Sequence, residues 1–267
     1  MAIYTDERIE FLEKRRRDKP YKMAVAHFHK NHELYYLIEG QTRYFVGNEI
    51  FLLEAGDMIF VPKGEFHKTV YEENTNTERV LFGFDDTFAN GEFFKYIDEM
   101  TQNKHITFPK DKAHKIKDLV DRCIKENENK PKGYEDMKKL LLGELLIAIS
   151  RYRKTEAVPI SPAYTSMQEI AKYISAHCNA DLSLQALSKQ FSISPNHLSK
   201  QFKKATGVGL SEYINIARIT AAEKLLAQGN IPITRVATEC GFNDSNYFAA
   251  VFKKIKGITP KKYSMTK

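Results

Sequence analysis

The stretch SPNHLSKQFKKATG, residues 194–207, ends in a sequence that the chain repeats. QFKKATG at 201–207 recurs as VFKKIKG at 251–257, with identical Phe, Lys, Lys and Gly residues at an offset of 50. A short apolar helical segment precedes each copy, LQALSKQF before the first and ITRVATECGF before the second. The repeat therefore predicts two copies of one helical unit in this part of the chain.

Each copy is preceded by residues that favour the start of a helix. Ser194 and Pro195 stand before the first copy and Asp244 before the second. Ser or Asp at an N-cap accepts hydrogen bonds from free backbone donors, and Pro at the first helical position loses nothing there. Helix, short turn and capped second helix, twice over, is the pattern of a helix-turn-helix unit. Between the copies, residues 210–229 are predicted to form one amphipathic helix that ends at Gly229.

The second helix of each unit is predicted to bury one face and expose the other. The apolar anchors are Leu198 and Phe202 in the first and Phe248, Val251 and Phe252 in the second. The candidate DNA-binding residues are Asn196, Ser199, Lys200, Lys203 and Lys204 in the first, and Ser245, Asn246, Ala250, Lys253 and Lys254 in the second. Asn suits the adenine edge, Ser either edge, and Lys a guanine or a phosphate. The later lysines favour phosphates, which position a protein without reading sequence.

The excess positive charge of the chain lies in the same region. Residues 161–267 hold 14 Lys and Arg against 6 Asp and Glu, a net of +8, whereas residues 1–160 hold 27 and 28, a net of −1. For a single helix, scattered lysines usually mean a charged face in solvent. Two matched copies within the net-positive region favour nucleic-acid binding instead.

Residues 168–264 resemble the AraC-type transcription regulators. The resemblance is carried by Leu184, Ala186, Leu187 and Ser188, by SPNHLSKQFKKATG, by Arg218, Ala222, Leu225 and Leu226, and by GFNDSNYFAAVFKKIKGITPKKY. It implies two units that the helix between them sets into successive major grooves on one DNA face. Ala249-Ala250 stand where the family commonly has Ser-Arg, and Ser264 stands where an Arg often follows Tyr263. The second unit is therefore expected to read fewer bases or to hold phosphate less tightly.

Residues 21–85 show a different pattern, typical of strands. Short runs rich in Val, Ile, Phe and Tyr, such as ELYYLIEG, TRYFVGN and RVLFGFD, alternate with turn residues. The turn residues include Gly40, Gly47, Gly56 and Gly64. Short, evenly spaced strands with such punctuation predict an antiparallel sandwich or a small barrel.

Three histidines and a glutamate stand out within these strands. His27 and His29 are two apart, which places both imidazoles on one face of a strand, while Glu33 follows and His67 lies downstream. The spacings His27-x-His29-x3-Glu33-x6-Gly40 and Gly56-x5-Pro62-x-Gly64-x2-His67 resemble the two cupin motifs. The resemblance implies that these four side chains converge inside a barrel. Tyr21 and Tyr71 replace the Gly and Asn that bound the two motifs, and neither is a ligand position.

The four converging side chains allow two interpretations. Imidazoles and a carboxylate suit a divalent transition metal (Zn, Fe, Mn or Ni) held by His27, His29, Glu33 and His67. The same side chains could instead hydrogen-bond a polar effector or one another, as the family resemblance implies. Alternation places Tyr35 on the face of Glu33, as an effector contact or as part of the barrel core. His32 points to the opposite face and is expected at the surface.

The middle of the chain is predicted to be helical, in two segments at 111–127 and 134–153. The second has apolar residues on more than one face, which predicts burial against its own domain and against a second subunit. Residues 155–162, TEAVPISP, indicate a linker. The expected fold is α+β: an antiparallel cupin barrel with flanking helices, joined to an all-α domain of two helix-turn-helix units. The expected ranges are a sensor at 1–105, a helical dimerisation segment at 106–154, a linker at 155–164 and a DNA-binding domain at 165–267.

Composition excludes several classes of protein. No apolar run is long enough to span a bilayer, and the charged N-terminal residues lack the apolar core of a secretory signal. Cys123, Cys178 and Cys240 are odd in number and scattered, which excludes a disulfide framework and a thiolate zinc site. A reducing, cytoplasmic location is expected.

The leading hypothesis is a ligand-responsive, sequence-specific transcription regulator and not an enzyme. The family resemblance suggests an activator of a sugar or small-molecule utilisation operon, acting as a homodimer on promoter DNA with RNA polymerase as a partner. A metal-dependent cupin enzyme tethered to DNA and an architectural DNA-binding protein whose barrel only dimerises are the two alternatives.

Overall fold

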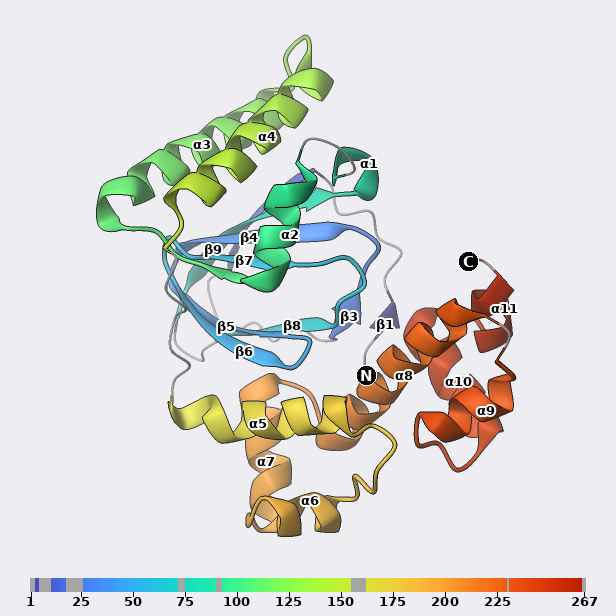
Figure 1. Cartoon of the computed structure of the whole chain (residues 1–267). Helices are drawn as coiled ribbons and strands as arrows, with labels where there is room; N and C mark the ends of the chain where they lie inside the picture. The colour runs from blue at the N-terminus through green and yellow to red at the C-terminus, as the bar shows by residue number, and fades with distance from the viewer. Residues whose placement is uncertain are drawn as a thin grey trace.

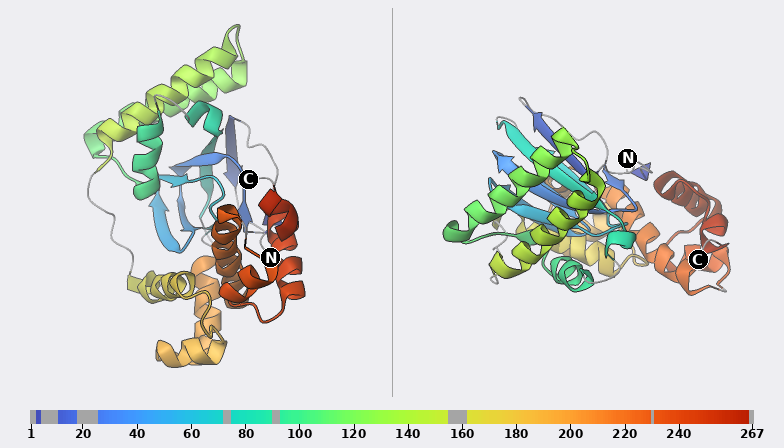
Figure 2. Two further views of the ribbon diagram at one scale, coloured as in Figure 1. Left: turned by 45° about the vertical axis from the view of Figure 1, so that its right-hand side comes forward. Right: turned by 90° about the horizontal axis from the view of Figure 1, so that it is seen from above.

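A computed structural model describes residues 3–4, 11–17, 26–71, 75–89, 93–154, 162–229 and 231–265. A β-sandwich lies between a pair of long helices on one side and a helical C-terminal domain on the other (Figure 1). The helical domain runs below and beside the sandwich, and the views from the side and from above agree on this arrangement (Figure 2). The sandwich is therefore covered on both of its outer faces.

The sandwich consists of two five-stranded sheets. The first has the order β1 (Ile3–Tyr4), β3 (His27–Phe28), β8 (His67–Tyr71), β5 (Gln41–Val46) and β6 (Glu49–Glu54). The second has the order β10 (His105–Ile106), β7 (Met58–Val61), β4 (His32–Glu39), β9 (Thr77–Phe84) and β2 (Leu12–Arg17). All pairings are antiparallel except that of β1 with β3. The antiparallel β fold predicted from the sequence is confirmed.

Strand β2 was not expected, because its sequence, LEKRRR, is charged and lacks an apolar alternation. It pairs along its length with β9, from Leu12 opposite Phe82 to Arg17 opposite Thr77. Since β2 lies at the edge of its sheet, its charged side chains can reach solvent, and only Leu12 is buried. Lys14 pairs with Glu78 at 3.1 Å across the two strands.

Alternation along the strands creates three apolar clusters. The interior of the sandwich holds Tyr35, Leu37, Tyr44, Val46, Leu53, Ile59 and Val61. The outer face of the second sheet, including Leu34, Phe60 and Phe82, packs against α2 (Phe94–Gln102), α3 (Lys110–Asn129) and α4 (Tyr134–Tyr152), and a short helix α1 (Asp86–Ala89) precedes these three. The outer face of the first sheet packs against the helical domain through Phe28, Phe45, Ile50 and Phe66. Both sheets are thus apolar on both faces, which keeps the sandwich between its helical neighbours.

The helical domain contains the two repeated units. The first comprises α6 (Leu184–Gln190) and α7 (Pro195–Thr206), and the second α9 (Ile233–Glu239) and α10 (Ser245–Lys256). Helix α5 (Pro162–Ala176) precedes them, α8 (Leu210–Gln228) connects them, and α11 (Pro260–Met265) follows. The repeated glycine has a structural reason: Gly207 and Gly257 end α7 and α10 in left-handed conformations, with φ of 74° and 76°.

The predicted helix starts are confirmed in one unit and partly wrong in the other. The Asp244 side chain accepts hydrogen bonds from the backbone N–H groups of Asn246 and Tyr247. Ser194 occupies the N-cap position of α7, but its hydroxyl accepts no such bond. The start of α7 relies on Pro195, whose ring favours the first helical position.

Two expected boundaries differ from the structure. Helix α5 begins at Pro162, inside the range expected for the linker, and the rest of TEAVPISP lies outside the described residues, as does Tyr21. Strand β10 pairs with β7 through His105 and Ile106, so the second sheet extends one residue past the expected end of the sensor at 105.

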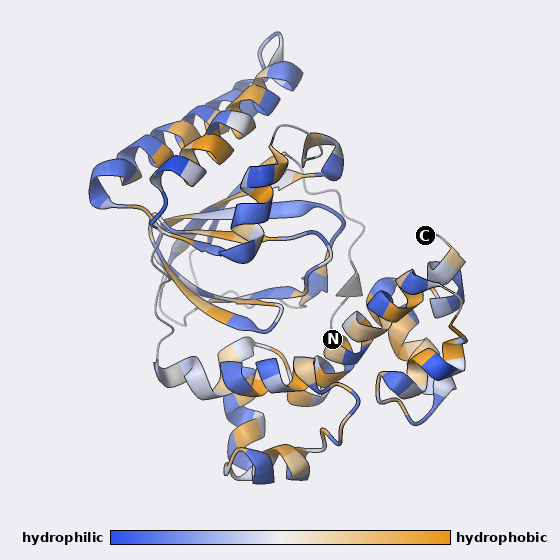
Figure 3. Ribbon diagram, in the orientation of Figure 1, coloured by the Kyte–Doolittle hydropathy of each residue, from blue (hydrophilic) through white to orange (hydrophobic). Residues whose placement is uncertain are grey.

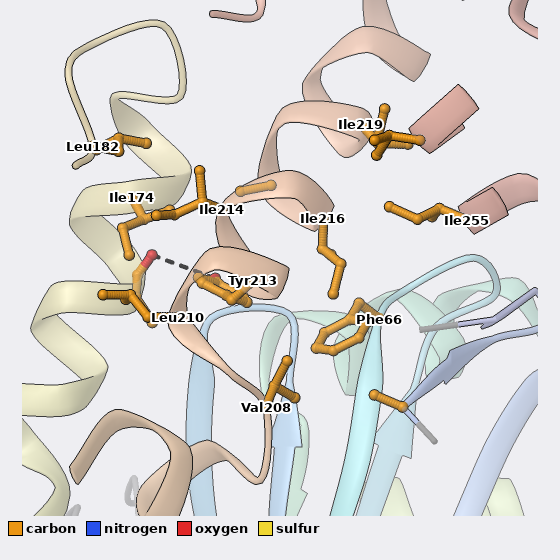
Figure 4. Close-up of a cluster of buried hydrophobic side chains, with 14 of the residues drawn as sticks. Phe66, Ile174, Leu182, Val208, Leu210, Tyr213, Ile214, Ile216, Ile219 and Ile255 are labelled. Carbon is orange, nitrogen blue, oxygen red and sulfur yellow. Dashed lines mark hydrogen bonds between the residues drawn. The ribbon is translucent and has the colours of Figure 1, made fainter. Parts of the chain in front are cut away.

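The contact between the sandwich and the helical domain centres on Tyr213 of α8. Its hydroxyl donates to the Gly47 carbonyl at 3.1 Å and lies 2.9 Å from Ser175 Oγ. Its ring packs against Phe45 with a centroid distance of 5.3 Å. It also packs against Phe66 with a centroid distance of 6.3 Å (Figure 4). This contact joins the two parts of the chain in one core.

Tyr213→Phe tests the strength of this contact. Because the lost hydroxyl is buried and hydrogen-bonded, we expect the free energy of unfolding to fall by about 1–2 kcal/mol. Tyr247→Phe is the matched control, since the Tyr247 side chain is 53% exposed and its loss should cost less than about 0.5 kcal/mol. Urea denaturation followed by circular dichroism measures both, and equal losses would show that the buried hydroxyl contributes nothing.

Candidate metal centre and nucleic-acid interface

Three imidazoles meet inside the sandwich. One ring nitrogen from each of His27, His29 and His67 lies within 4.8 Å of the others. His27 of β3 stands opposite His67 of β8 in the strand register, and their ring centroids are 4.3 Å apart. The His29 and His67 centroids are 4.7 Å apart. We call these three residues and Glu33 the histidine cluster.

Two of the imidazoles are oriented by backbone carbonyls. His29 Nδ1 donates to the Asn31 carbonyl at 2.7 Å, and His67 Nδ1 donates to the Glu65 carbonyl at 3.0 Å. Since a carbonyl only accepts, the proton of each neutral ring sits on Nδ1 and the lone pair on Nε2. Both Nε2 atoms are buried and have no hydrogen-bond partner among the described residues. This is how a metal-binding histidine is held, with its outer nitrogen fixed and its inner nitrogen free.

Glu33 supplies the negative charge of the cluster. Its Oε1 accepts a hydrogen bond from the Tyr44 hydroxyl at 2.8 Å, and its Oε2 lies 3.4 Å from His29 Nε2 and 3.9 Å from His67 Nε2. Burial raises the pKa of Glu33, but His29 and the other imidazoles outweigh burial and hold that pKa well below its usual range. The carboxylate is therefore ionised at neutral pH.

The two buried imidazoles differ in their affinity for a proton. Burial and repulsion by His27 hold the pKa of His67 well below its usual value, so this ring is neutral. Burial also lowers the pKa of His29, but the adjacent Glu33 outweighs it and the net pKa is raised. An Nε2 lone pair that faces a carboxylate oxygen at 3.4 Å is repulsive unless a proton or a metal ion lies between them. The residues therefore fit a divalent transition metal, which would take the place of that proton.

The structure brings together His27, His29, Glu33 and His67, the four predicted ligands. Tyr35 lies one step away: it packs in the interior cluster, with its ring centroid 5.0 Å from that of Tyr44. Tyr44 contacts Glu33 directly and was not predicted. Alternation in TRYFVGN could have placed it on the interior face.

The expected surface position of His32 was wrong. Its ring is 7% exposed and stacks against both Phe60 and Phe84, while its Nε2 lies 3.4 Å from Asp86 Oδ1. His32 does point away from Glu33, but helices cover that outer face of the sheet. Alternation along a strand predicts the sheet face on which a side chain lies, but it does not predict whether other elements cover that face.

The candidate DNA-binding residues lie on α7 and α10, as predicted. The exposed ones are Asn196, Ser199, Lys200, Lys203 and Lys204 on α7, and Asn246, Ala250, Lys253 and Lys254 on α10, whereas Ser245 is half-buried. The five apolar anchors on the opposite faces are all buried, with exposed fractions of 4% or less. One large exposed side chain was not predicted: Tyr247 of α10, whose hydroxyl accepts from Asn215 Nδ2 at 3.2 Å. Its position beside Asn246 makes it a further candidate for contact with DNA.

A groove runs beside the pair of long helices. Its volume is about 1290 Å³, and its lining includes apolar Phe84, Phe88, Phe93, Leu142 and Ile147 and basic Lys115, Lys139 and Arg151. Hydrophobic and hydrophilic residues alternate along α3 and α4 (Figure 3). On α4, Leu140 is 67% exposed and Met137 is 42% exposed. Among the described helices, none is long and apolar enough to cross a membrane.

Comparison with known protein families yields two matches. A helix-turn-helix domain matches residues 187–265, which include α7, α8 and α10. A cupin domain matches residues 17–82, which include all four residues of the histidine cluster. The two matches agree with the division of the structure into a sandwich and a helical domain.

Relatives with curated functions match over about half to most of the chain. The transcriptional activator RhaR of Escherichia coli O139:H28 is 21% identical over 248 residues, covering 91% of this chain and 88% of that protein. RhaR of Escherichia coli K12 is 31% identical over 129 residues, covering 48% of this chain and 46% of that protein.

Two solved structures are also similar to this chain. The C-terminal domain of AraT, a response regulator from Geobacillus stearothermophilus, is 28% identical and covers 41% of this chain and 89% of that chain, with a TM-score of 0.38. ToxT from Vibrio cholerae is 14% identical and covers 96% of this chain and 98% of that chain, also with a TM-score of 0.38.

His67→Ala tests the histidine cluster as a metal centre. The change removes one of the converging imidazoles, so we expect the affinity for Zn²⁺ to fall by at least about 100-fold, since even outer partners of metal ligands contribute ~10–100-fold. His114→Ala, on the exposed face of α3, is the control and should leave the affinity unchanged. Isothermal titration of protein purified without chelators or a histidine tag measures both. Equal zinc affinity in the two variants would place any metal elsewhere.

Proposed function

We propose that promoter binding by this chain responds to the ligand bound in the histidine cluster. The premise is that the chain is an AraC-type transcription regulator with an N-terminal cupin domain and not an enzyme. The observation that carries this proposal is the contrast between two sets of side chains. The imidazoles converge in the interior, whereas the polar faces of α7 and α10 remain open to DNA. In this proposal the cupin domain binds the effector, and the helical domain binds promoter DNA.

The species that the cluster senses is a divalent transition metal, Zn, Fe, Mn or Ni, in this proposal. Among the described residues, the buried Nε2 atoms of His29 and His67 have no hydrogen-bond partner and face one ionised carboxylate, which supports a cation. Tyr35, Leu37 and Tyr44 are at most 1% exposed and fill the interior beside the cluster, which supports a small ligand over a large one. A bound metal would supply a positive centre that draws Glu33 and the imidazoles together. A small polar effector such as a sugar, with contacts that include Tyr35, is the second candidate.

The regulatory outcome that we propose is activation of a neighbouring small-molecule utilisation operon. The related RhaR proteins are transcriptional activators. An activator of this kind acts on promoter DNA in the cytoplasm and contacts RNA polymerase. Its effector must bind one arrangement of the sensor better than another, because only differential binding can shift promoter occupancy.

A gel-shift assay with the DNA upstream of the neighbouring operon tests the proposed function. Asn196→Ala and Lys200→Ala should each relax discrimination between sites by about 1–3 kcal/mol, because they remove groups that can contact base edges. Lys253→Ala should weaken binding to all sequences and lower the salt dependence by about one ion, because it removes a phosphate contact. Lys125→Ala, on the exposed face of α3, is the control.

The gel shift also separates a regulator from a protein that only organises DNA. A regulator requires that Zn²⁺, another of the four metals or a candidate sugar changes the affinity for the specific site. No specific shift under any of these conditions would contradict the proposal.

The chain forms a homodimer through α4 in this proposal. Exposure of Leu140 and Met137 beside an apolar groove supports a second copy as the occupant of this surface. Leu140→Asp should raise the dimer dissociation constant by at least about tenfold, or 1.4 kcal/mol, because a charge would be buried at the contact. Leu52→Asp is the control, since Leu52 is 40% exposed on β6. Sedimentation velocity measures both, and a wild-type monomer or equal constants would contradict the dimer.

A further inference from the structure

Strands β3 and β8 have a different role on each face. On β3 and just after it, His27 and His29 point into the sandwich, and Phe28 between them belongs to the core shared with the helical domain. On β8, His67 belongs to the histidine cluster, whereas Phe66 before it and Lys68 after it contact the helical domain. Each strand therefore carries cluster residues on one face and contacts to the DNA-reading helices on the other.

The outward face of β3 touches helix α10. Lys256, near the end of α10, places its Nζ 3.9 Å from the centre of the Phe28 ring. The same Nζ lies 2.6 Å from Glu223 Oε2 of α8, and Lys256 is only 6% exposed. A buried cation with an ionic partner and an aromatic face has little freedom, so Phe28 fixes the end of α10.

The first sheet also holds the end of helix α7. Lys68 Nζ of β8 donates to the Gly207 carbonyl at 2.7 Å, and Arg43 Nη2 of β5 donates to the Lys204 carbonyl at 3.0 Å. Both carbonyls lie at the C-terminal end of α7, where backbone acceptors lack helical partners and positive charge is favourable. A Cβ at Gly207 would lie 2.7 Å from Val70 Cγ2, so β8 and the end of α7 are in close contact.

The joint between β3 and β8 is short and lies at the histidine cluster. Among the described residues, one pair, His27 and His67, stands in register between the two strands, and we call this pairing the joint. Helix α10 is thus attached to one side of this joint and α7 to the other. A ligand that binds all three imidazoles takes two from the β3 side and one from β8, and so it bridges the joint.

We propose that a divalent metal ion in the histidine cluster locks β3 to β8 and thereby fixes the position of α10 relative to α7. This inference rests on the proposed sensing role of the cluster, and it states how ligand binding there would change the arrangement of the helices that bind DNA. Two recognition helices on one DNA face must be spaced by about one helical turn, 34–36 Å. A joint that sets this spacing controls whether both helices can enter the DNA together. The linker helix α8 connects the two units, and the sensor gives them a second, ligand-dependent connection.

The distance between the two recognition helices tests the proposal directly. Spin labels on keto-bearing unnatural residues at Ser199 of α7 and Ala250 of α10, both exposed, report that distance by pulsed electron resonance. The labelled full-length chain is diluted with unlabelled chain so that only distances within one chain contribute. We expect a broad distribution with EDTA and a single narrow population with one equivalent of Zn²⁺.

A disulfide between β3 and β8 tests the effect of linking these strands independently of which ligand binds in the histidine cluster. His27→Cys with His67→Cys places two thiols at facing positions, where oxidation by diamide forms one disulfide across the joint and reduction by dithiothreitol opens it. If zinc and the disulfide both narrow the distribution, or either one alone does so, the joint is supported. If only the disulfide acts, the metal ligand of the proposed function is wrong and the joint still holds. If neither changes the distribution, the proposal is overturned.

Lys68→Met tests whether the effect of metal binding reaches α7 through the contact between β8 and Gly207. This variant should bind zinc as tightly as the wild type by titration but keep a broad distribution, because the contact with Gly207 is lost. Lys14→Met, on β2 of the other sheet, is the matched control and should respond to zinc as the wild type does. A normal zinc response in the Lys68 variant would overturn the route through β8.

Discussion

Burial of the outer face of the first sheet against the helical domain is the interaction on which the rest of the structure depends. Phe28, Phe45, Ile50 and Phe66 are each at most 3% exposed there, and each such side chain contributes about 1.5–3 kcal/mol when buried. Their sum is comparable to the whole stability of a typical domain, about 5–15 kcal/mol. A sandwich without its helical partner would expose this face to water. The sensor and the DNA-reading domain are therefore coupled by the same apolar contact that keeps them folded.

The polar contacts of the interface fix the orientation of the two parts that the apolar contact holds together, because hydrogen bonds are directional. Arg43 and Lys68 donate to carbonyls at the end of α7, and the Tyr213 hydroxyl donates to a turn of the first sheet. The contacts of Arg43 and Lys68 involve the C-terminal end of α7, whereas Asn196 and Lys200 nearer its start remain exposed. The sensor therefore holds the helix without covering the surface that DNA would use.

The electrostatics of the histidine cluster suit a cation. A buried carboxylate is costly unless it is hydrogen-bonded and faces positive charge. Tyr44 supplies one hydrogen bond to Glu33, and His29 supplies the nearest positive charge only when it is protonated. A metal ion in the cluster would satisfy the carboxylate and the imidazole lone pairs together, which a proton on one ring cannot do.

The sequence by itself determined the local elements and the residue types of both sites. The repeated glycine, the helices at 110–129 and 134–152, and the spacing of the four cluster residues follow from short-range patterns, which the backbone obeys wherever the segment lies. Only the tertiary structure decided which faces are covered: it buried His32, paired the charged strand β2 and placed Tyr44 against Glu33. Arg43 and Lys204 are 161 residues apart, and no local period relates two such positions. Their contact depends on how two folded domains pack, which the sequence encodes only through the whole fold.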